Sequence, residues 1–517
     1  MCRWRATILA ILARLPCLVV LLACAGTSHG QAPAETVWPT TSWTASTAEE
    51  QGLDSGSLAR LIDTVGARKQ DSLLVIRHGR IVAEAYYAPY AADIAHDLRS
   101  VTKSVVSTLT AIEIQQGLLA GVDRPIVSFF PDKTIANLDD NKRAMTVQSL
   151  LDMTSGIEWL EKSYTPDESI IRMYRSPDPT EFVLNQPMSG APGSKFYYNS
   201  GNPYVLSALI NKLTGHSALE FAKAELFGPL GISSARWGEV DAQGVTDGEA
   251  GLFLTPRDMA KIGYLYLHDG LWEGRRIIPS SWVERARAGK IQATFGFHYA
   301  NLWWSLPEKG AYMALGRHSQ IILVLPGLDI IAVMTGIMGD DEYYPTARLI
   351  DDIAGAVKSD KPLPPDAVAQ SLLAASIRGA ATERPSPLGE TPDSAKTISG
   401  KLYRFGDNEL HVRTISLNLV DAPASWEITT KESAAPPERF AGLLGLEGVF
   451  QLSPRASYGI NAVKGRWLNA HTFSIERRIL GHGETQFWAL AFDGKTVDVS
   501  FVSSDGLKVE LRGEATD

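Results

Sequence analysis

The sequence has very little cysteine. Its three cysteines, Cys2, Cys17 and Cys24, all lie among the first 24 of 517 residues. The rest of the chain therefore has no disulfide and no thiol to act as a nucleophile or a metal ligand. The ten histidines show no metal-ligand spacing of the H-E-x-x-H kind. We therefore predict a protein that uses neither a metal nor another cofactor.

The chain also has no large excess of charge of either sign. The formal net charge is −9, and charged residues make up 21% of the sequence against 45% for hydrophobic residues. These proportions are typical of a soluble globular protein, and a chain without a basic face is not expected to bind nucleic acid. A chain of 517 residues is too long for one compact core, so we expect two or more domains.

No hydrophobic run after the N-terminal region has the length of a transmembrane helix. Residues 1–30 are typical of an export signal, because basic residues precede a short apolar run and small residues precede Gln31. We expect a periplasmic or secreted protein. The segment 21–24 also resembles a bacterial lipobox, so a membrane-anchored lipoprotein, lipidated on Cys24, is the alternative. An uncleaved anchor is the third interpretation.

The segment that begins at Ser100 carries the clearest chemical signal. Apolar residues follow it at helical spacing and Gly117 suits a helix end, so Ser100 is predicted at a helix N-terminus. Lys103 lies one turn further on, on the same face. A partly desolvated lysine can take the proton of a serine hydroxyl, and the helix N-terminus favours negative charge arising nearby. Ser-x-x-Lys occurs once in the chain, although the pattern alone is weak.

Two later segments offer partners for Ser100. Tyr198 is predicted on a loop before a helix, where a tyrosinate beside an ammonium can act as a base. The alternative is an ordinary core aromatic, a role that suits the neighbouring Tyr197 better. Gly316 ends a predicted strand, where the next backbone N–H, that of Arg317, can join the N–H of Ser100 as an oxyanion hole.

The pattern of elements predicts an α+β fold followed by an all-β domain. A hairpin at 73–87 and strands at 296–304, 310–315, 319–325 and 329–335 enclose a mostly helical region between 118 and 235. We predict a signal at 1–30, a first domain at 31–358, a linker with a short helix at 359–395 and a β-rich domain at 396–517. Short strands with Gly or Asp turns suggest a sandwich or barrel there.

Together the three sites resemble a known family. The order Ser100-x-x-Lys103, then Tyr198-Asn199-Ser200, then a strand ending in glycine is similar to the serine β-lactamase and DD-peptidase superfamily. It is closest to the class C branch, with family VIII carboxylesterases and 6-aminohexanoate-dimer hydrolases. Residues 147–156 resemble the family's "LLxMTSG" segment, and residues 251–261 resemble its "GLxxTxxDxAK" segment. The resemblance covers roughly residues 50–355.

The resemblance implies a β-lactamase/transpeptidase-like antiparallel sheet with helices and an inserted helical lobe. It implies that Ser100 is the acylated nucleophile, Lys103 the proton acceptor beside it and Tyr198 the general base. The N–H groups of Ser100 and Arg317 would form the oxyanion hole, and Ser200 and Gly316 would contact the substrate. The expected partner is a small ester, amide or peptide.

The chain departs from the class C pattern at two positions. Ser200 replaces an asparagine, and Ala314 replaces the lysine of the Lys-Thr-Gly strand. The missing cation would hold a substrate carboxylate, so its loss favours an esterase or amidase. A β-lactamase or D-alanyl-D-alanine carboxypeptidase is the alternative, and Arg317 or His318 is a candidate replacement charge. Rivals of other classes are a penicillin-type sensor without turnover and an inactive structural protein.

Two further motifs have competing interpretations. The segment 181–185 looks like the "ExxLN" of class A β-lactamases, but it precedes Tyr198 instead of following it. We therefore interpret Asn185 as an ordinary helix-end residue. Trp303 and Trp304 either line a substrate cleft or pack in the core, which is the commoner fate of aromatic side chains.

Overall fold

The computed structural model describes residues 36–337, 346–386, 391–430, 438–456 and 459–516, and the predicted export signal lies outside these ranges. Within them, no helix combines the length and the apolar character that crossing a membrane requires. The description below concerns the unit that begins at Val37.

A nine-stranded sheet forms the centre of the first part of this unit. Its order is β1-β3-β2-β14-β13-β12-β11-β10-β9, antiparallel except for the β1–β3 pair. The strands are β1 (Thr44–Ala45), β2 (Gln70–Arg77), β3 (Arg80–Tyr86), β9 (Ile291–Gln292), β10 (His298–Ala300), β11 (Trp303–Leu306), β12 (Ala311–Gly316), β13 (Gln320–Leu325) and β14 (Ile330–Gly336).

Both faces of this sheet are buried, because apolar residues fill consecutive positions of its central strands. In β2, Leu73 and Val75 pack on one side and Leu74 and Ile76 on the other, as the period of two along a strand requires. One face carries α1 (Ser55–Gly66), α11 (Thr346–Ala356) and α12 (Ala367–Ala380), which are joined to it in one apolar cluster. The other face carries α2 (Val101–Gln115), α9 (Pro256–Leu267) and α10 (Ser280–Ala288).

A helical lobe is inserted between α2 and α9. It comprises α3 (Asp140–Ala144), α4 (Val147–Leu151), α5 (Ser169–Tyr174), α6 (Pro179–Asn185), α7 (Gly201–Thr214) and α8 (Ala218–Ala222). Short polar residues begin several of these helices. The Asp178 carboxylate accepts from the N–H of Glu181 at the start of α6, and Thr146 and Ser149 form a reciprocal capping box at the start of α4. Two small sheets, β4-β6-β5 and β7-β8, are separate from the nine-stranded sheet. Their strands are β4 (His96–Asp97), β5 (Arg236–Trp237), β6 (Leu252–Leu254), β7 (Leu271–Trp272) and β8 (Arg275–Arg276).

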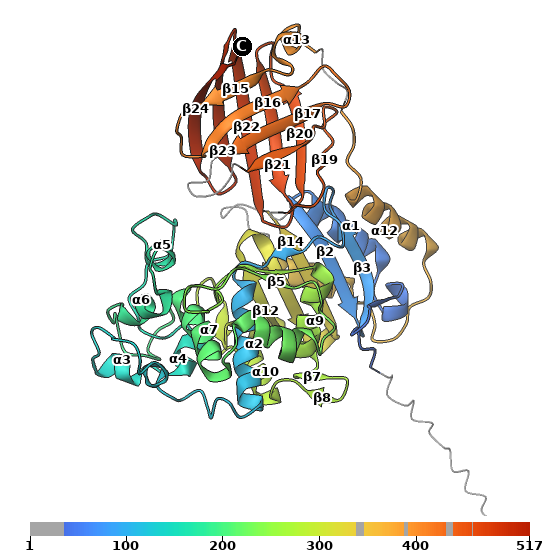
Figure 1. The fold of residues 1–517 in the computed structure, drawn as a ribbon. Coiled ribbons are helices and arrows are strands. Elements are labelled where there is room, and N and C mark those ends of the chain that lie inside the picture. Colours follow the sequence, from blue (N-terminus) through green and yellow to red (C-terminus); the bar gives the residue numbers. More distant parts are fainter. Residues whose placement is uncertain (1–35, 338–345, 387–390, 431–437, 457–458, 517) are drawn as a thin grey trace, which may run out of the picture. The chain divides into compact units, whose positions relative to one another are not determined.

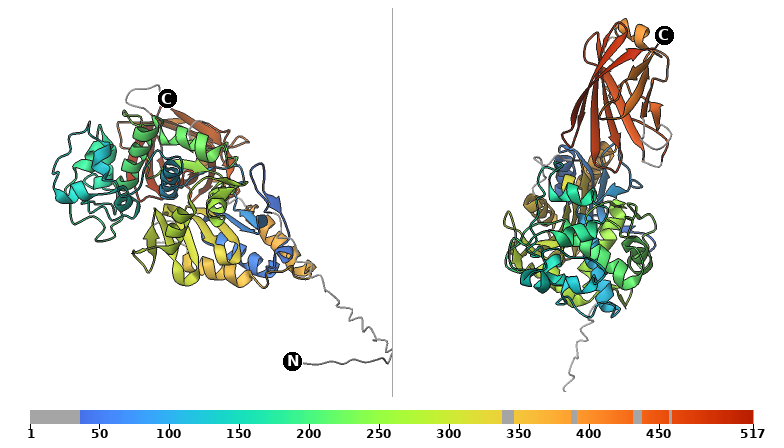
Figure 2. Two further views of the ribbon diagram at one scale, coloured as in Figure 1. Left: turned by 90° about the horizontal axis from the view of Figure 1, so that it is seen from below. Right: turned by 60° about the vertical axis from the view of Figure 1, so that its left-hand side comes forward.

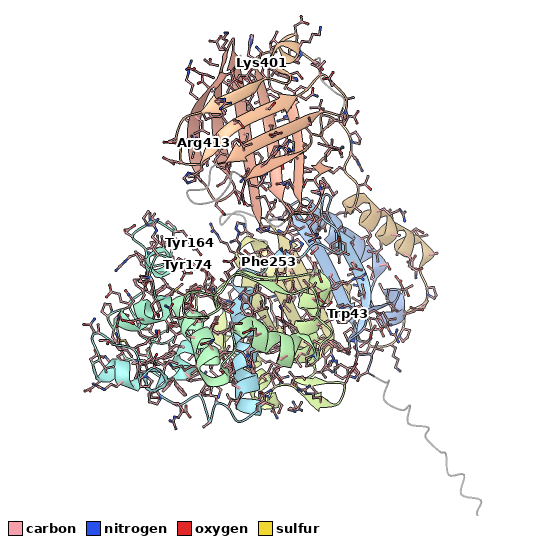
Figure 3. All side chains as sticks on the ribbon, viewed as in Figure 1. Trp43, Tyr164, Tyr174, Phe253, Lys401 and Arg413 are labelled. Carbon is pink, nitrogen blue, oxygen red and sulfur yellow. The ribbon has the colours of Figure 1, made fainter. Side chains whose placement is uncertain are left out.

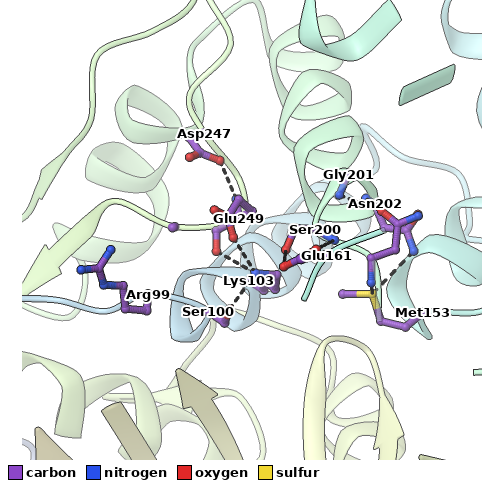
Figure 4. A network of polar contacts seen from close by, with 12 residues as sticks. Arg99, Ser100, Lys103, Met153, Glu161, Ser200, Gly201, Asn202, Asp247 and Glu249 are labelled. Atoms are coloured by element: carbon purple, nitrogen blue, oxygen red, sulfur yellow. Dashed lines mark hydrogen bonds and ion pairs between the residues drawn. The ribbon is translucent and has the colours of Figure 1, made fainter. Parts of the chain in front are cut away.

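The C-terminal part is one ten-stranded antiparallel sheet that follows the short helix α13 (Ser394–Ile398). Figure 2 shows its orange-to-red strands curving strongly. They are β15 (Leu402–Phe405), β16 (Val412–Asn418), β17 (Ser425–Thr430), β18 (Arg439–Leu443), β19 (Gln451–Leu452), β20 (Asn461–Trp467), β21 (Thr472–Ile479), β22 (Glu484–Asp493), β23 (Thr496–Ser503) and β24 (Lys508–Ala515). Gly445, which follows the terminal strand β18, bridges to Lys464 on β20, so the sheet is nearly a barrel.

The structure confirms the predicted fold class, with one difference in detail. The strand predicted at 296–304 is two strands, because Asn301 and Leu302 adopt positive φ and turn the chain between β10 and β11. The short helix predicted within 359–395 is α12, which spans Ala367–Ala380 and packs against α1 and β3.

The packing of α12 on α1 predicts a difference between two adjacent leucines. Leu373 is 7% exposed and belongs to the apolar cluster of this face, whereas Leu372 is 56% exposed. We expect Leu373→Ala to lower the free energy of unfolding by about 2–3 kcal/mol, and Leu372→Ala to change it by less than about 0.5 kcal/mol. Denaturant unfolding of both variants measures this, and equal effects would show that α12 does not belong to the core.

Candidate active site

The predicted nucleophile lies at a strained turn before a buried helix. Ser100 is the N-cap of α2, and Arg99 before it adopts a positive φ of 48°, a conformation uncommon for non-glycine residues. The Arg99 guanidinium donates to the carbonyl oxygen of His482 at 2.8 Å, and the backbone N–H of Arg99 donates to Asp97 Oδ1 at 3.0 Å. The Ser100 hydroxyl makes no capping bond to its own helix, so it is free of the usual N-cap role.

Lys103 reaches back to Ser100 from the first turn of α2. Its Nζ donates to Ser100 Oγ at 2.8 Å, to the carbonyl oxygen of Glu249 at 3.0 Å and to Glu249 Oε2 at 2.9 Å. An ammonium has three protons, and here each has an acceptor. Burial alone would lower the pKa of this group, but the neighbouring Glu249, Tyr198 and Glu161 hold it well above its usual range. The side chain is therefore a cation that donates to the Ser100 oxygen.

Tyr198 completes the group around Ser100. Its side chain lies near that of Ser100, and the Lys103 Nζ lies 5.2 Å from the centre of its ring. Burial raises the pKa of Tyr198, while the Lys103 charge and the nearby Ser100 side chain oppose this rise. Trp304 stacks on the ring with centroids 6.1 Å apart, which helps to fix its orientation.

The loop after Tyr198 is fixed by the start of α7. Asn199 Oδ1 accepts from the N–H of Gly201 at 2.8 Å and of Asn202 at 3.3 Å. Ser200 is fully buried, and its hydroxyl donates to Glu161 Oε1 at 2.7 Å. Ser200, predicted to contact substrate, thus has its hydroxyl engaged by Glu161.

The buried Glu249 and the half-buried Glu161 are carboxylates that sequence reasoning missed. Glu161 accepts from the N–H of Ser200 at 3.0 Å and from Trp159 Nε1 at 2.8 Å. Burial raises the pKa of Glu161, with Lys103 acting in the opposite direction. Burial would also raise the pKa of Glu249, but contact with Lys103 and a hydrogen bond from Tyr174 hold it below its ordinary value. A signal existed in the sequence: Asp247 and Glu249 are two acids directly before the motif that begins at Gly251.

The end of β12 lies against the nucleophile turn. The pairing of β12 with β11 ends at Met313, and Gly316 is the last residue of the strand. A Cβ at Gly316 would lie 2.4 Å from the carbonyl oxygen of Leu98 and 3.2 Å from the backbone nitrogen of Ser100. Glycine is therefore required for this close approach. It brings the backbone of Gly316, which precedes Arg317, close to the backbone nitrogen of Ser100.

The side chains after Gly316 are engaged at the rim of the site. The Arg317 guanidinium lies 4.9 Å from the ring centre of Tyr164 and 3.9 Å from Asp505. His318 Nε2 lies 3.4 Å from the same aspartate, which lowers the pKa of Asp505. The two candidate replacement cations are thus both partnered by Asp505.

The structure brings together the predicted Ser100 and Lys103 of α2, Tyr198 of the loop before α7 and Gly316 of β12. Other predictions lie away from this group. Asn185 accepts from the N–H of Ala136 at 2.6 Å, so it is an ordinary structural residue. Trp303 is fully buried in the core and only Trp304 contacts Tyr198, whereas Tyr197 is 46% exposed and the prediction that it packs in the core is wrong. Among the described residues, no group of three or more His, Cys, Asp or Glu side chains is arranged to hold a metal ion.

The contact at Gly316 predicts a measurable cost for one methyl group. Since the added Cβ would meet backbone and not a flexible side chain, Gly316→Ala forces a shift of the strand or of the nucleophile turn. We expect a loss of about 1–3 kcal/mol in the free energy of unfolding. The control is Gly327→Ala, where no atom lies within 4 Å of the added Cβ. Equal stability of both variants would show that β12 does not approach Ser100 this closely.

Comparison with known proteins agrees with this geometry. The Beta-lactamase family model matches residues 58–353. The chain is 28% identical over 285 residues to the 6-aminohexanoate-dimer hydrolase of Paenarthrobacter ureafaciens, a match that covers 51% of this chain and 71% of that protein.

Solved structures give the same fold. The hydrolase EstCE1, described as having promiscuous acyltransferase activity, superposes with a TM-score of 0.50 at 17% identity, over 59% of this chain and 99% of that one. A structure described as a putative β-lactamase from Bacteroides dorei superposes with a TM-score of 0.50 at 16% identity, over 59% of this chain and 100% of that one. The family match covers more than half of the sequence and contains the whole Ser100 group. The chain belongs to the β-lactamase family, within the serine β-lactamase and DD-peptidase superfamily.

Proposed function

We propose that the protein is a serine hydrolase that cleaves an ester or amide through an acyl-enzyme on Ser100. The observation that carries the proposal is the contact of Lys103 Nζ with the Ser100 hydroxyl at 2.8 Å, with the Tyr198 ring 5.2 Å from the same Nζ. Because the Lys103 protons are all directed at acceptors, we assign the role of base to Tyr198. The family relatives named as hydrolases support the same chemistry.

The proposed reaction has two halves. The reacting form has Tyr198 as a tyrosinate beside the Lys103 ammonium. The Ser100 oxygen attacks the substrate carbonyl carbon while its proton passes to this tyrosinate, and Tyr198 returns that proton to the leaving alcohol or amine as the bond to it breaks. In the second half, water attacks the acyl carbon, gives its proton to Tyr198, and Ser100 regains a proton as the acid leaves. The backbone N–H groups of Ser100 and Arg317 would stabilise the oxyanion in both halves.

The surroundings of the site favour a substrate without a carboxylate at the family's lysine position. Ala314 stands where that lysine would be, and Arg317 is partnered by Tyr164 and Asp505. We therefore rank esterase or amidase activity above β-lactamase or D-alanyl-D-alanine carboxypeptidase activity. A panel of p-nitrophenyl esters, nitrocefin, a D-Ala-D-Ala peptide and a 6-aminohexanoate dimer decides between them. A single acylation burst without turnover on every substrate would instead identify a sensor.

The N-terminal sequence supports action outside the cytoplasm. We propose cleavage of the export signal and a periplasmic or secreted enzyme, with lipidation of Cys24 as the alternative. The mass of the mature protein from its native cells distinguishes a chain that begins near Gln31 from one that begins at a lipidated Cys24.

Loss of the Ser100 hydroxyl should abolish turnover. We expect Ser100→Ala to retain less than about a hundredth of the wild-type kcat, since no acyl-enzyme can form. The control is Ser194→Ala, which removes a hydroxyl from the exposed loop before Tyr198. A fluorophosphonate probe followed by mass spectrometry of the labelled peptide tests the nucleophile directly. Labelling of any other serine would refute the assignment.

Removal of the Tyr198 hydroxyl tests the proposed base. Tyr198→Phe keeps the ring that stacks on Trp304 and should lower kcat by about 10²–10⁴-fold. If deacylation suffers more than acylation, the acyl-enzyme accumulates and is visible by mass spectrometry. Tyr197→Phe, next to it and half exposed, is the matched control. Near wild-type turnover in Tyr198→Phe would assign both proton transfers to Lys103.

A further inference from the structure

A chain of polar groups leads away from Lys103 on the side opposite Ser100. Glu249 accepts from Lys103 through Oε2, and its other oxygen, Oε1, is hydrogen-bonded to the hydroxyl of Tyr174. The same hydroxyl lies 2.8 Å from Asp247 Oδ2. Tyr174 ends helix α5 of the helical lobe and is 46% exposed, so the chain runs from the buried ammonium towards solvent.

The hydrogen bonds of this chain do not balance if both carboxylates are ionised. Tyr174 has one hydroxyl proton but touches two carboxyl groups. Each ionised carboxylate is an acceptor only. One of the two acids must therefore hold a proton for both contacts to be hydrogen bonds. Asp247 or Glu249 is therefore a carboxylic acid as long as the Tyr174 hydroxyl is hydrogen-bonded to both.

The surroundings decide which acid holds the proton. Glu249 faces the Lys103 ammonium, which favours its ionised form. Asp247 Oδ1 accepts only a backbone bond, from the N–H of Glu249 at 2.9 Å. In agreement with this, burial and the charge of Glu249 raise the pKa of Asp247 to about 7. The protonated Asp247 donates to Tyr174, which then donates to Glu249.

We propose that Asp247, Tyr174 and Glu249 are positioning residues that hold the Lys103 ammonium against Ser100, and that the arrangement is complete only while Asp247 carries a proton. This proposal rests on the hydrolase function proposed above. Ionised Asp247 competes with Glu249 for the single Tyr174 proton and adds a negative charge beside the Lys103 pair. Glu249 then fixes the position of the Lys103 ammonium less firmly, and proton transfer from Ser100 is slower.

Other titratable groups face this chain from each element packed around it. They are Lys103 from α2, Glu161 and Tyr164 from the loop before α5, Tyr198 from the loop before α7, and Tyr204 from α7. Titration of Lys103 or Tyr198 also alters the rate, so the pH profile of the wild type alone does not isolate Asp247. The comparison of a variant with the wild type does so, because these shared steps cancel in the ratio.

Asp247→Asn is the decisive variant. An asparagine amide can donate to Tyr174 while its oxygen accepts from the N–H of Glu249, so it imitates the protonated acid at every pH. Below pH 6 both proteins have the complete chain, and the ratio of variant to wild-type kcat/KM should be near one. Above pH 8 only the wild type has lost the complete arrangement, and the ratio should rise about threefold to tenfold, with a midpoint near 7, as expected for the loss of one ordinary hydrogen bond. A ratio independent of pH overturns the proposal.

The Tyr174 hydroxyl must carry the effect if the chain is correct. In a Tyr174→Phe background, adding Asp247→Asn should leave the ratio of kcat/KM flat with pH. Tyr204→Phe is the matched control, because Tyr204 donates to Asp241 at 2.9 Å in the same segment without reaching Lys103. In that background the rise with pH should persist. The proposed hydrogen-bond chain is contradicted if the ratio depends on pH in the Tyr174→Phe background, or if the rise of the ratio with pH is lost in the Tyr204→Phe background.

A measurement without substrate separates this proposal from the hydrolase function. Infrared difference spectra of the resting protein should show a carboxylic-acid carbonyl band that disappears as the pH rises through about 7. The band should be absent from Asp247→Asn and present in Tyr204→Phe. If the band behaves in this way in a protein that hydrolyses no substrate of the panel, the proposed function is wrong and the proton assignment stands. Absence of the band from the wild type overturns the assignment.

Discussion

A buried ammonium group with three acceptors is the interaction on which the site depends. Lys103 is almost inaccessible to solvent, and an unpaired charge there would cost several kcal/mol. Glu249 supplies two of its three acceptors and Ser100 the third. The position of the nucleophile therefore depends on the loop that carries Glu249, which lies 146 residues after Lys103 in the sequence.

Because Lys103 needs all three acceptors, the helical lobe must pack against the sheet in one defined position. The lobe contributes Glu161, Tyr174 and Tyr198, while the sheet contributes the end of β12 at Gly316. Rigid elements on both sides hold these residues: α2 is buried along almost its whole length, and β12 lies between β11 and β13. Small errors in this packing would separate Lys103 from its acceptors, and a site built on rigid elements avoids them.

The surroundings of Lys103 are acidic, with Glu249 and Glu161 as its charged neighbours. Ser200 stands in place of the class C asparagine, and its hydroxyl turns to Glu161 and not to an open cleft. Ala314 in place of a lysine removes a positive charge, so the side chains of the site carry more negative charge in total. Both differences agree with a substrate that carries no carboxylate at that position, which is the basis for ranking an esterase or amidase first.

The sequence by itself determined the family, the fold class and four of the residues that meet at the site. Ser100 and Lys103 are one helical turn apart, so their contact follows from local geometry alone, and Tyr198 and Gly316 lie in motifs of recognisable order. Only the tertiary structure identified Glu249, Glu161 and Tyr174, because their roles arise from long-range contacts that leave no periodic pattern. The tertiary structure also showed that Trp303 lies in the core while Trp304 contacts Tyr198. Neighbouring residues of a strand face opposite sides of the sheet, and only the packed sheet shows which side holds the site.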